Sequence, residues 1–177
     1  IRHEIIDECY ISENDAGTRS DGIDWDAVER EAFILTGNER MLSGLDTKAG
    51  KKNDKVVPSG RITIADPQHD GGKPVGVAGV RVSCNTFVKF DEAYTDENGY
   101  YQMDKKFAVD LNYKLVFKNE KGFAIGVNLV LVPASVSTLG KAGPEGVNMT
   151  VTEASEDKLF KRCVVNNAIY DYLKRCD

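Results

Sequence analysis

Apolar and polar residues alternate with a period of two through the middle of the chain, from about residue 59 to residue 152. The clearest runs are "RITIA" (61–65), "GVRVSCN" (79–85), "YKLVFK" (113–118) and "VNMTVT" (147–152). Such alternation is typical of strands with one buried face. Turn sequences such as Gly71-Gly72 and Asn98-Gly99 separate the runs. The pattern predicts a mainly β fold of antiparallel sheets, arranged as a sandwich or a barrel.

Before this region, in "WDAVEREAFILTG" (25–37), apolar residues recur at the spacing of an α-helix. Asp24 is a suitable N-cap and Gly37 a suitable end. One expected face combines Trp25, Val28, Ala32 and Leu35. The segment therefore predicts an amphipathic helix that packs against another part of the protein.

After the alternating region, residues 155–177 have a helical pattern, with Ser155 as the expected cap. The apolar residues form two faces. One contains Leu159, Cys163, Tyr170 and Leu173, and the other contains Val165, Ala168, Ile169, Tyr172 and Cys176. A surface helix normally needs only one apolar face. Two interpretations stand: the second face binds a following domain or a second copy, or the helix lies between the sheet and the N-terminal segment.

These patterns divide the chain into three parts. Residues 1–58 form an N-terminal helical and irregular segment, in which "DTKAGKKNDK" (46–55) suggests a flexible connector. Residues 59–152 form the β region. Residues 153–177 form a C-terminal helix, for which a following domain after Asp177 is one of the open alternatives.

Composition narrows the classes of partner. The chain has 177 residues, is 41% hydrophobic and carries a net charge of −5. Its lysines and arginines are interspersed with acidic residues, so nucleic acid is not an expected partner. The longest apolar run, residues 127–134, is far shorter than the roughly 20 residues of a membrane-spanning helix, and no span is expected.

The four cysteines are Cys9, Cys84, Cys163 and Cys176, and none forms a C-x-x-C pair. This spacing argues against a structural zinc site. On one helix, Cys163 and Cys176 would lie about 20 Å apart and cannot pair. A bridge from Cys9 to the C-terminal helix and free or buried thiols are both open.

The stretch "SGRITIADPQHDGGKPVGVAGVRVSC" followed by "AYTDENGYYQM" resembles the carboxypeptidase regulatory-like domain, as found in Bacteroidetes-type surface proteins. The residues that carry the family pattern are Gly60, Asp66, Pro74, Val80, Thr95, Asp96, Gly99 and Tyr101. The resemblance implies a transthyretin-like (prealbumin-like) antiparallel Greek-key β-sandwich of about seven strands. The match departs in an extended first loop, Pro67 to Gly71, and in "VDLNYKL" (109–115), where the family has Pro-Gly.

The resemblance also implies a function. Such domains are non-catalytic accessory modules of secreted or cell-envelope proteins, where they space or dock a neighbour, often a peptidase. We therefore expect no enzymatic activity and no cofactor in this chain, and a protein partner for its C-terminal helix. Transthyretin-fold ureide hydrolases rely on several histidines, whereas this sequence has two.

Two candidate sites remain beside this expectation. Asp66 and Asp70 flank His69 in "ADPQHDGG", where a calcium site and an ordinary polar loop are both open. Asp96 and its neighbours in "TDENG" are interpreted as turn chemistry, with a hairpin at Asn98-Gly99. The alternative function is a carbohydrate- or peptide-binding module that uses loops near His69 and the exposed ring of Tyr100.

Overall fold

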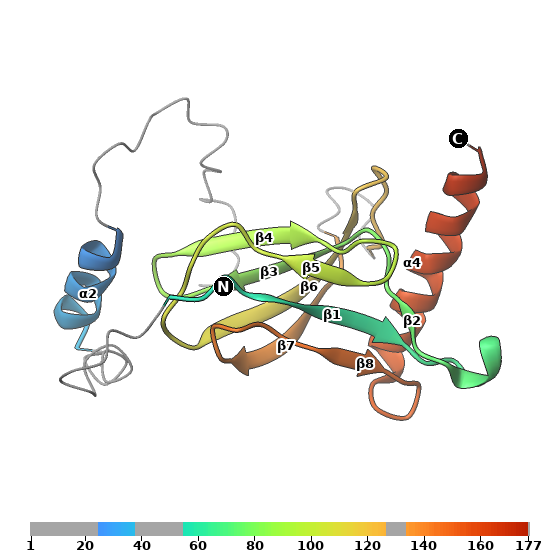
Figure 1. The fold of residues 1–177 in the computed structure, drawn as a ribbon, viewed down its shortest axis with the longest axis horizontal. Helices are drawn as coiled ribbons and strands as arrows, with labels where there is room; N and C mark the ends of the chain where they lie inside the picture. Colours follow the sequence, from blue (N-terminus) through green and yellow to red (C-terminus); the bar gives the residue numbers. More distant parts are fainter. Residues whose placement is uncertain (1–24, 38–54, 127–133, 177) are drawn as a thin grey trace.

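The computed structural model describes residues 25–37, 55–126 and 134–176, without the side chains of Trp25, Asp26, Glu29 and Asp70 (Figure 1). Within this part of the chain the protein is mainly β, with two sheets and two helices. The first sheet contains β1 (Ser59–Ile64), β2 (Val75–Gly76), β5 (Tyr100–Gln102) and β8 (Met149–Val151). The second contains β3 (Val80–Asn85), β4 (Phe90–Tyr94), β6 (Leu111–Asn119) and β7 (Val136–Ala142).

The second sheet has the order β4-β3-β6-β7, and all of its pairs are antiparallel. In the first sheet, β1 is central and pairs antiparallel with β2 and β5. Its pair with β8 is parallel, which differs from the predicted antiparallel arrangement. The parallel pair forms because β8 follows a connection that crosses from the second sheet and runs along the opposite edge of β1.

One hydrophobic core joins the two sheets, and the predicted alternation is confirmed there. Ile62 and Ile64 of β1 are buried, as are every second residue of β3 and β6. These inward residues are Val80, Val82, Cys84, Tyr113, Leu115 and Phe117. A buried apolar side chain contributes about 1.5–3 kcal/mol, so this shared core is the main stabilising term of the described fold.

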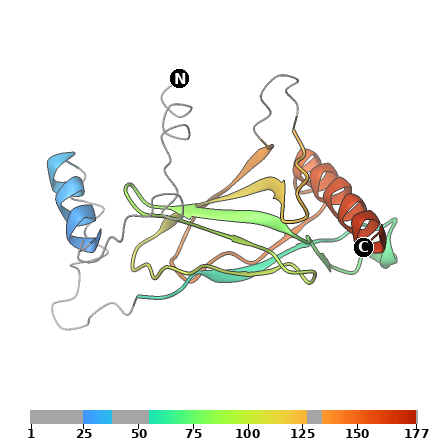
Figure 2. The same cartoon turned by 90° about the horizontal axis from the view of Figure 1, so that it is seen from above.

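The two helices lie at opposite ends of the sheets (Figures 1 and 2). Helix α2 (Trp25–Leu35) is followed by a turn that contains Gly37, the predicted stop residue, in a left-handed conformation with a φ of 68°. Its predicted apolar stripe is wrong: Leu35 is 77% exposed, whereas Phe33 is buried and its ring lies 6.2 Å from that of Phe87. Contact with this aromatic loop residue, rather than the aliphatic stripe, decides which side faces inward.

Helix α4 (Asp157–Cys176) confirms the predicted C-terminal helix, with one correction at its start. Ser155 does not cap it. The Ser155 hydroxyl instead donates to the carbonyl of Thr152 at 2.9 Å and accepts from the Thr152 amide at 3.0 Å. These bonds close a tight turn before the helix, which occupies the hydroxyl that a cap would use. The inward residues are Leu159, Phe160, Cys163, Asn166 and Tyr170.

A short 3-10 turn, η2 (Asp70–Gly72), completes the described elements and lies in the loop between β1 and β2. It confirms the predicted turn at Gly71-Gly72. Among the described helices, none is long and apolar enough to cross a membrane.

Candidate functional site

The turn at residues 94–100 reverses the chain, but it does not join two paired strands. β4, before the turn, pairs with β3 in the second sheet, and β5, after it, pairs with β1 in the first sheet. The predicted hairpin is therefore wrong, and the turn is a connection between the two sheets. Its tight geometry is retained because the Asp96 amide donates to Tyr100 and the Gly99 amide donates to Asp96.

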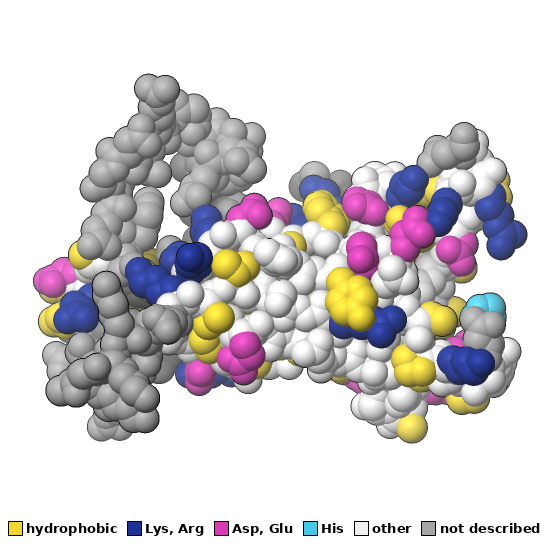
Figure 3. Space-filling model, viewed as in Figure 1, with side chains coloured by type: hydrophobic (Ala, Val, Ile, Leu, Met, Phe, Trp, Pro, Cys, Tyr) yellow, Lys and Arg dark blue, Asp and Glu magenta, His cyan; other side chains and the backbone are white. Residues whose placement is uncertain are grey.

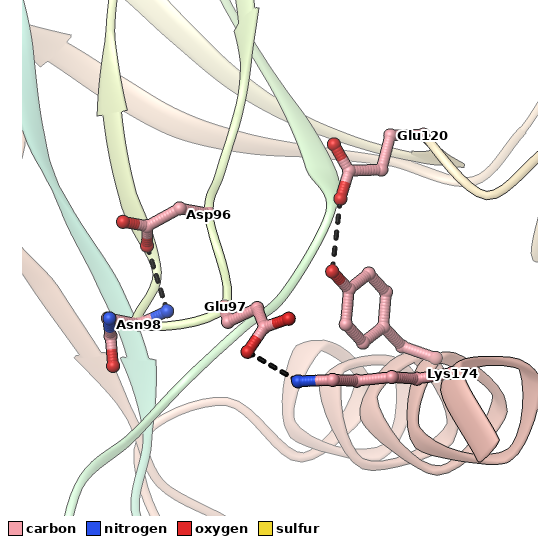
Figure 4. A network of polar contacts seen from close by, with 6 residues as sticks. Asp96, Glu97, Asn98, Glu120 and Lys174 are labelled. Carbon is pink, nitrogen blue, oxygen red and sulfur yellow. Dashed lines mark hydrogen bonds and ion pairs between the residues drawn. The ribbon is translucent and has the colours of Figure 1, made fainter. Parts of the chain in front are cut away.

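The acidic residue of this turn has a structural role, as the interpretation of "TDENG" predicts. The Asp96 carboxylate accepts the amides of Asn98 and Tyr100, each at 2.8 Å, and Figure 4 draws the bond from Asn98. Gly99 has a φ of 81°, and a Cβ there would collide with the carbonyl oxygen of Ile62. The turn is thus packed directly on β1, and only glycine fits at that position.

Thr95 links the turn to the loop before β3. Its buried hydroxyl donates to the carbonyl of Val77 at 2.6 Å and accepts the amide of Val80 at 3.0 Å. Gly79 also donates its amide to the carbonyl of Thr95 at 2.9 Å. Thr95 therefore fixes the loop between Val77 and Val80, at the end of the sheets where α4 attaches.

Three asparagines, which we call the Asn clamp, connect this loop to α4: Asn119, Asn166 and Asn167. Asn166 is fully buried; its side chain donates to the carbonyl of Ala78 at 2.8 Å and accepts from the side-chain NH₂ of Asn119 at 2.9 Å. Asn167 accepts the Ala78 amide at 3.1 Å and donates to the carbonyl of Gly76 at 2.8 Å. A fully bonded polar group in a core imposes one geometry, so the clamp orients the helix on the sheets.

Two further polar contacts extend the junction toward the end of α4. The Lys174 ammonium lies 2.6 Å from the Glu97 carboxylate (Figure 4). The hydroxyl of Tyr170 donates to Glu120 at 3.1 Å, and burial with this hydrogen bond raises the pKa of Tyr170 to about 12. Because the Glu97–Lys174 pair is half exposed, it contributes little stability and chiefly guides the position of the helix end.

The opposite side of α4 is an exposed apolar surface, which we call the outer face: Val164, Val165, Ala168 and Tyr172. Val165 is 45% exposed and Tyr172 is 67% exposed. The structure places the inner face of α4 on the sheets. Helix α2 lies at the far end of the molecule and does not lie against α4 (Figure 2). No described residue covers the outer face.

Tyr100 is exposed, as its alternation with the buried Tyr101 predicts. The Arg61 guanidinium lies over the Tyr100 ring, with its central carbon 4.8 Å from the ring centroid. The same guanidinium donates to the carbonyl of Asn98 at 2.8 Å. The Tyr101 hydroxyl points the other way and bonds to both the amide and the carbonyl of Val147. Burial raises the pKa of Tyr101 to about 12.

An open groove of about 660 Å³ runs beside Tyr100. We call it the Tyr100 groove, and its lining includes Ser59, Gly60, Tyr100, Gln102, Glu145 and Asn148. The connection between β7 and β8 forms one wall, since the Ser59 amide donates to Glu145 and the Arg61 amide donates to the Asn148 side chain. Gly60 permits this close approach, because a Cβ there would collide with the carbonyl of Val147.

His69 does not line the Tyr100 groove, so the structure does not bring these two candidate ligand contacts together there. His69 is exposed in the loop after β1, where its amide donates to Asp66. The Asp66 carboxylate accepts the amide of Gln68 at 2.8 Å, which is a turn contact. The Asp70 side chain lies outside the described residues. Within the described ranges, no group of three or more His, Cys, Asp or Glu residues could hold a metal ion.

The two buried thiols, Cys84 and Cys163, have raised pKa values, whereas a catalytic cysteine needs a lowered one. Burial raises the pKa of both Cys84 and Cys163 to about 12, so each stays protonated at neutral pH. A reactive cysteine needs its thiolate, which a lowered pKa provides. Cys176 is exposed, and all three thiols are free. Cys9, and with it the predicted alternative of a bridge from that residue, lies outside the described part of the chain.

On the face that Figure 3 shows, which includes β1 and β5, positively and negatively charged side chains of the described residues are interspersed. The sequence did not predict the Asn clamp or the groove residues Gln102 and Glu145. Its only signal for the clamp was Asn166-Asn167, two residues of low helix propensity in the middle of a helix. Two asparagines in the middle of a helix, away from its ends, indicate a specific hydrogen-bonding role for their side chains.

Comparisons with known proteins give little further information. No family model matches the chain, and no curated protein matches it. Among solved structures, the crystal structure of (S)-allantoin synthase is similar with a TM-score of 0.32 and 14% sequence identity. The match covers 70% of this chain and 50% of that chain, so this chain spans about half of its length. This likeness is too weak to support an argument about fold or function.

Proposed function

We propose that this chain is a non-catalytic accessory module, which docks a neighbouring protein surface through the outer face of α4. The observation that carries the proposal is the division of α4 into two faces. The Asn clamp holds one face on the sheets, and the other presents Val165 and Tyr172 to solvent. Exposed apolar side chains on a rigidly oriented helix are suited to a protein interface.

The fold that we propose for this module is a Greek-key β-sandwich related to the carboxypeptidase regulatory-like domain. Successive connections that cross between the sheets support it, as does the shared core. If the two-residue β2 is counted as part of its loop, seven strands remain among the described residues. The resemblance in residues 59–103 further supports a place in a secreted or cell-envelope protein, beside a peptidase or another larger domain.

The docking function can be tested with a photo-cross-linking amino acid. Tyr172 is replaced by p-benzoylphenylalanine in the organism that makes the protein, and the matched control carries it at Tyr94, a 39% exposed position of β4. We expect a discrete cross-linked product at position 172 that Val165→Asp abolishes. Equal cross-linking at both positions, or a product that is unaffected by Val165→Asp, would contradict docking through this face.

The non-catalytic part is tested separately with the purified chain. We expect no turnover of ester, peptide or glycoside substrates, and no labelling of Cys84 or Cys163 by thiol-directed activity probes at pH 7. Turnover that survives purification to constant specific activity would contradict this part and leave the docking result unaffected.

A further inference from the structure

The Tyr100 groove contains polar groups whose hydrogen-bonding capacity is not used within the described structure. Neither the Glu145 carboxylate nor the side-chain amide of Gln102 has a hydrogen bond to another described residue. Asn148 accepts one bond through its side-chain oxygen, from the Arg61 amide, which leaves its NH₂ group as a donor. Acceptors and donors thus face the same open space.

An aromatic ring lies beside these polar groups. Tyr100 is 53% exposed although Arg61 lies over its ring, 4.8 Å from the centroid. The guanidinium and the backbone bonds of the turn hold this ring in position, so little conformational entropy is lost when a ligand stacks on it. A fixed ring with neighbouring carboxylate and amide groups is a common arrangement in small-ligand sites.

Charges of both signs lie at the groove, and a neutral ligand is repelled by neither. Asp96 and Glu145 line it, and the cationic Arg61 lies over the Tyr100 ring. The Asp96 carboxylate already accepts two turn amides, and a cationic peptide side chain would lie close to Arg61. A saccharide avoids this repulsion. Its hydroxyl groups both donate and accept, which suits a carboxylate beside amides, and its apolar C–H face stacks on a tyrosine ring.

We propose that the Tyr100 groove binds a neutral saccharide, with Tyr100 as the stacking platform and Gln102, Glu145 and Asn148 as hydrogen-bonding groups. This proposal does not rest on docking through α4, because no residue of α4 is among the described residues that line the groove. A chain could therefore bind a saccharide while its outer face binds a protein.

The test uses the full 177-residue chain, labelled with ¹⁵N, and a panel of neutral hexasaccharides: maltohexaose, cellohexaose, xylohexaose and chitohexaose. We expect at least one of them to shift the amide resonances of Tyr100, Gln102 and Asn148 at millimolar concentration. No shift at these residues with any member of the panel would overturn the proposal, as would binding by a lysine-rich peptide alone.

Variants separate the ring from its neighbours. Tyr100→Ala is expected to weaken saccharide binding by about tenfold or more, the loss typical of a central aromatic contact. Glu145→Gln is a second variant on the exposed wall, and it should weaken binding severalfold while the chain stays folded. Tyr94→Ala is the matched control, since Tyr94 is exposed but does not line the groove. Affinity that is equal in Tyr100→Ala, Glu145→Gln and Tyr94→Ala would contradict the assignment.

Discussion

Replacement of Asn166 by alanine tests whether the Asn clamp holds α4 on the sheets. The Asn166 side chain is fully buried, and it bonds to the carbonyl of Ala78 and to the amide of Asn119. The substitution removes both bonds, together with a longer one of 3.3 Å from the Asn166 side chain to the Asn167 side chain. The Ala78 carbonyl keeps its bond from Asn119, at 2.9 Å, but one N–H of Asn119 loses its acceptor in a buried position.

The magnitude follows from these groups. A lost hydrogen bond costs about 1 kcal/mol, and a buried donor without an acceptor costs about 1–3 kcal/mol. Alanine recovers roughly 0.5 kcal/mol through its higher helix propensity. We therefore expect Asn166→Ala to lower the free energy of unfolding by about 2–3 kcal/mol. With a urea m-value on the order of 2 kcal/mol/M, the midpoint should fall by about 1–1.5 M.

The assay is urea unfolding, followed by circular dichroism, together with hydrogen exchange of the α4 amides. Val165→Ala is the matched control on the same helix, because Val165 is 45% exposed and its replacement should change stability by less than about 0.5 kcal/mol. In the double variant with Asn119→Ala, the two losses should not add, because both residues share one hydrogen bond. A loss below about 0.5 kcal/mol in Asn166→Ala, with unchanged exchange in α4, would refute the clamp.

Three further predictions concern the turn, the thiols and the pH dependence of stability. Gly99→Ala should lower the free energy of unfolding by at least about 3 kcal/mol, because a Cβ would collide with the backbone of β1. Gly122 has a similar φ but lies in open space, so Gly122→Ala should cost only about 1–2 kcal/mol. Similar losses in the two variants would contradict this packing. Ellman's reagent at pH 8 should react rapidly with Cys176, and only slowly with Cys84 and Cys163 until the chain is unfolded in urea. Rapid reaction of either buried thiol in the folded chain would contradict its burial. Burial raises the pKa of these two thiols to about 12, so the folded chain keeps protons that the unfolded chain releases above about pH 9. The melting temperature should therefore fall as the pH rises from 9 to 11, and a constant value over this range would argue against the raised pKa values.

The strands were predictable from the sequence because burial alternates residue by residue along each of them. Ile62 and Ile64 face the core, and Tyr100 and Tyr101 face opposite ways, as a period of two requires. The partners of the strands were not predictable in the same way. Asn98-Gly99 shows that the chain reverses, but the sheet that receives each arm depends on contacts with β1 and β3, which are distant in sequence.

The candidate sites show the same division. The exposed ring of Tyr100 follows from local alternation, whereas its neighbours Glu145 and Asn148 reach it from a connection more than 40 residues away. The bond between Asn119 and Asn166 also joins residues that are 47 positions apart. A buried polar residue interrupts an apolar face in the sequence, and only the folded chain shows which group satisfies it.

The junction links the turn to the position of α4. Thr95 binds Val77 and Val80, and the loop between them supplies the Ala78 groups that the Asn clamp holds. Leu159 and Cys163 of α4 lie in the same hydrophobic core as the strands. The helix is therefore part of the folded unit rather than an appendage. Since the clamp orients the inner face, a change in the turn is expected to rotate or release the outer face as well, and to affect any surface docked there.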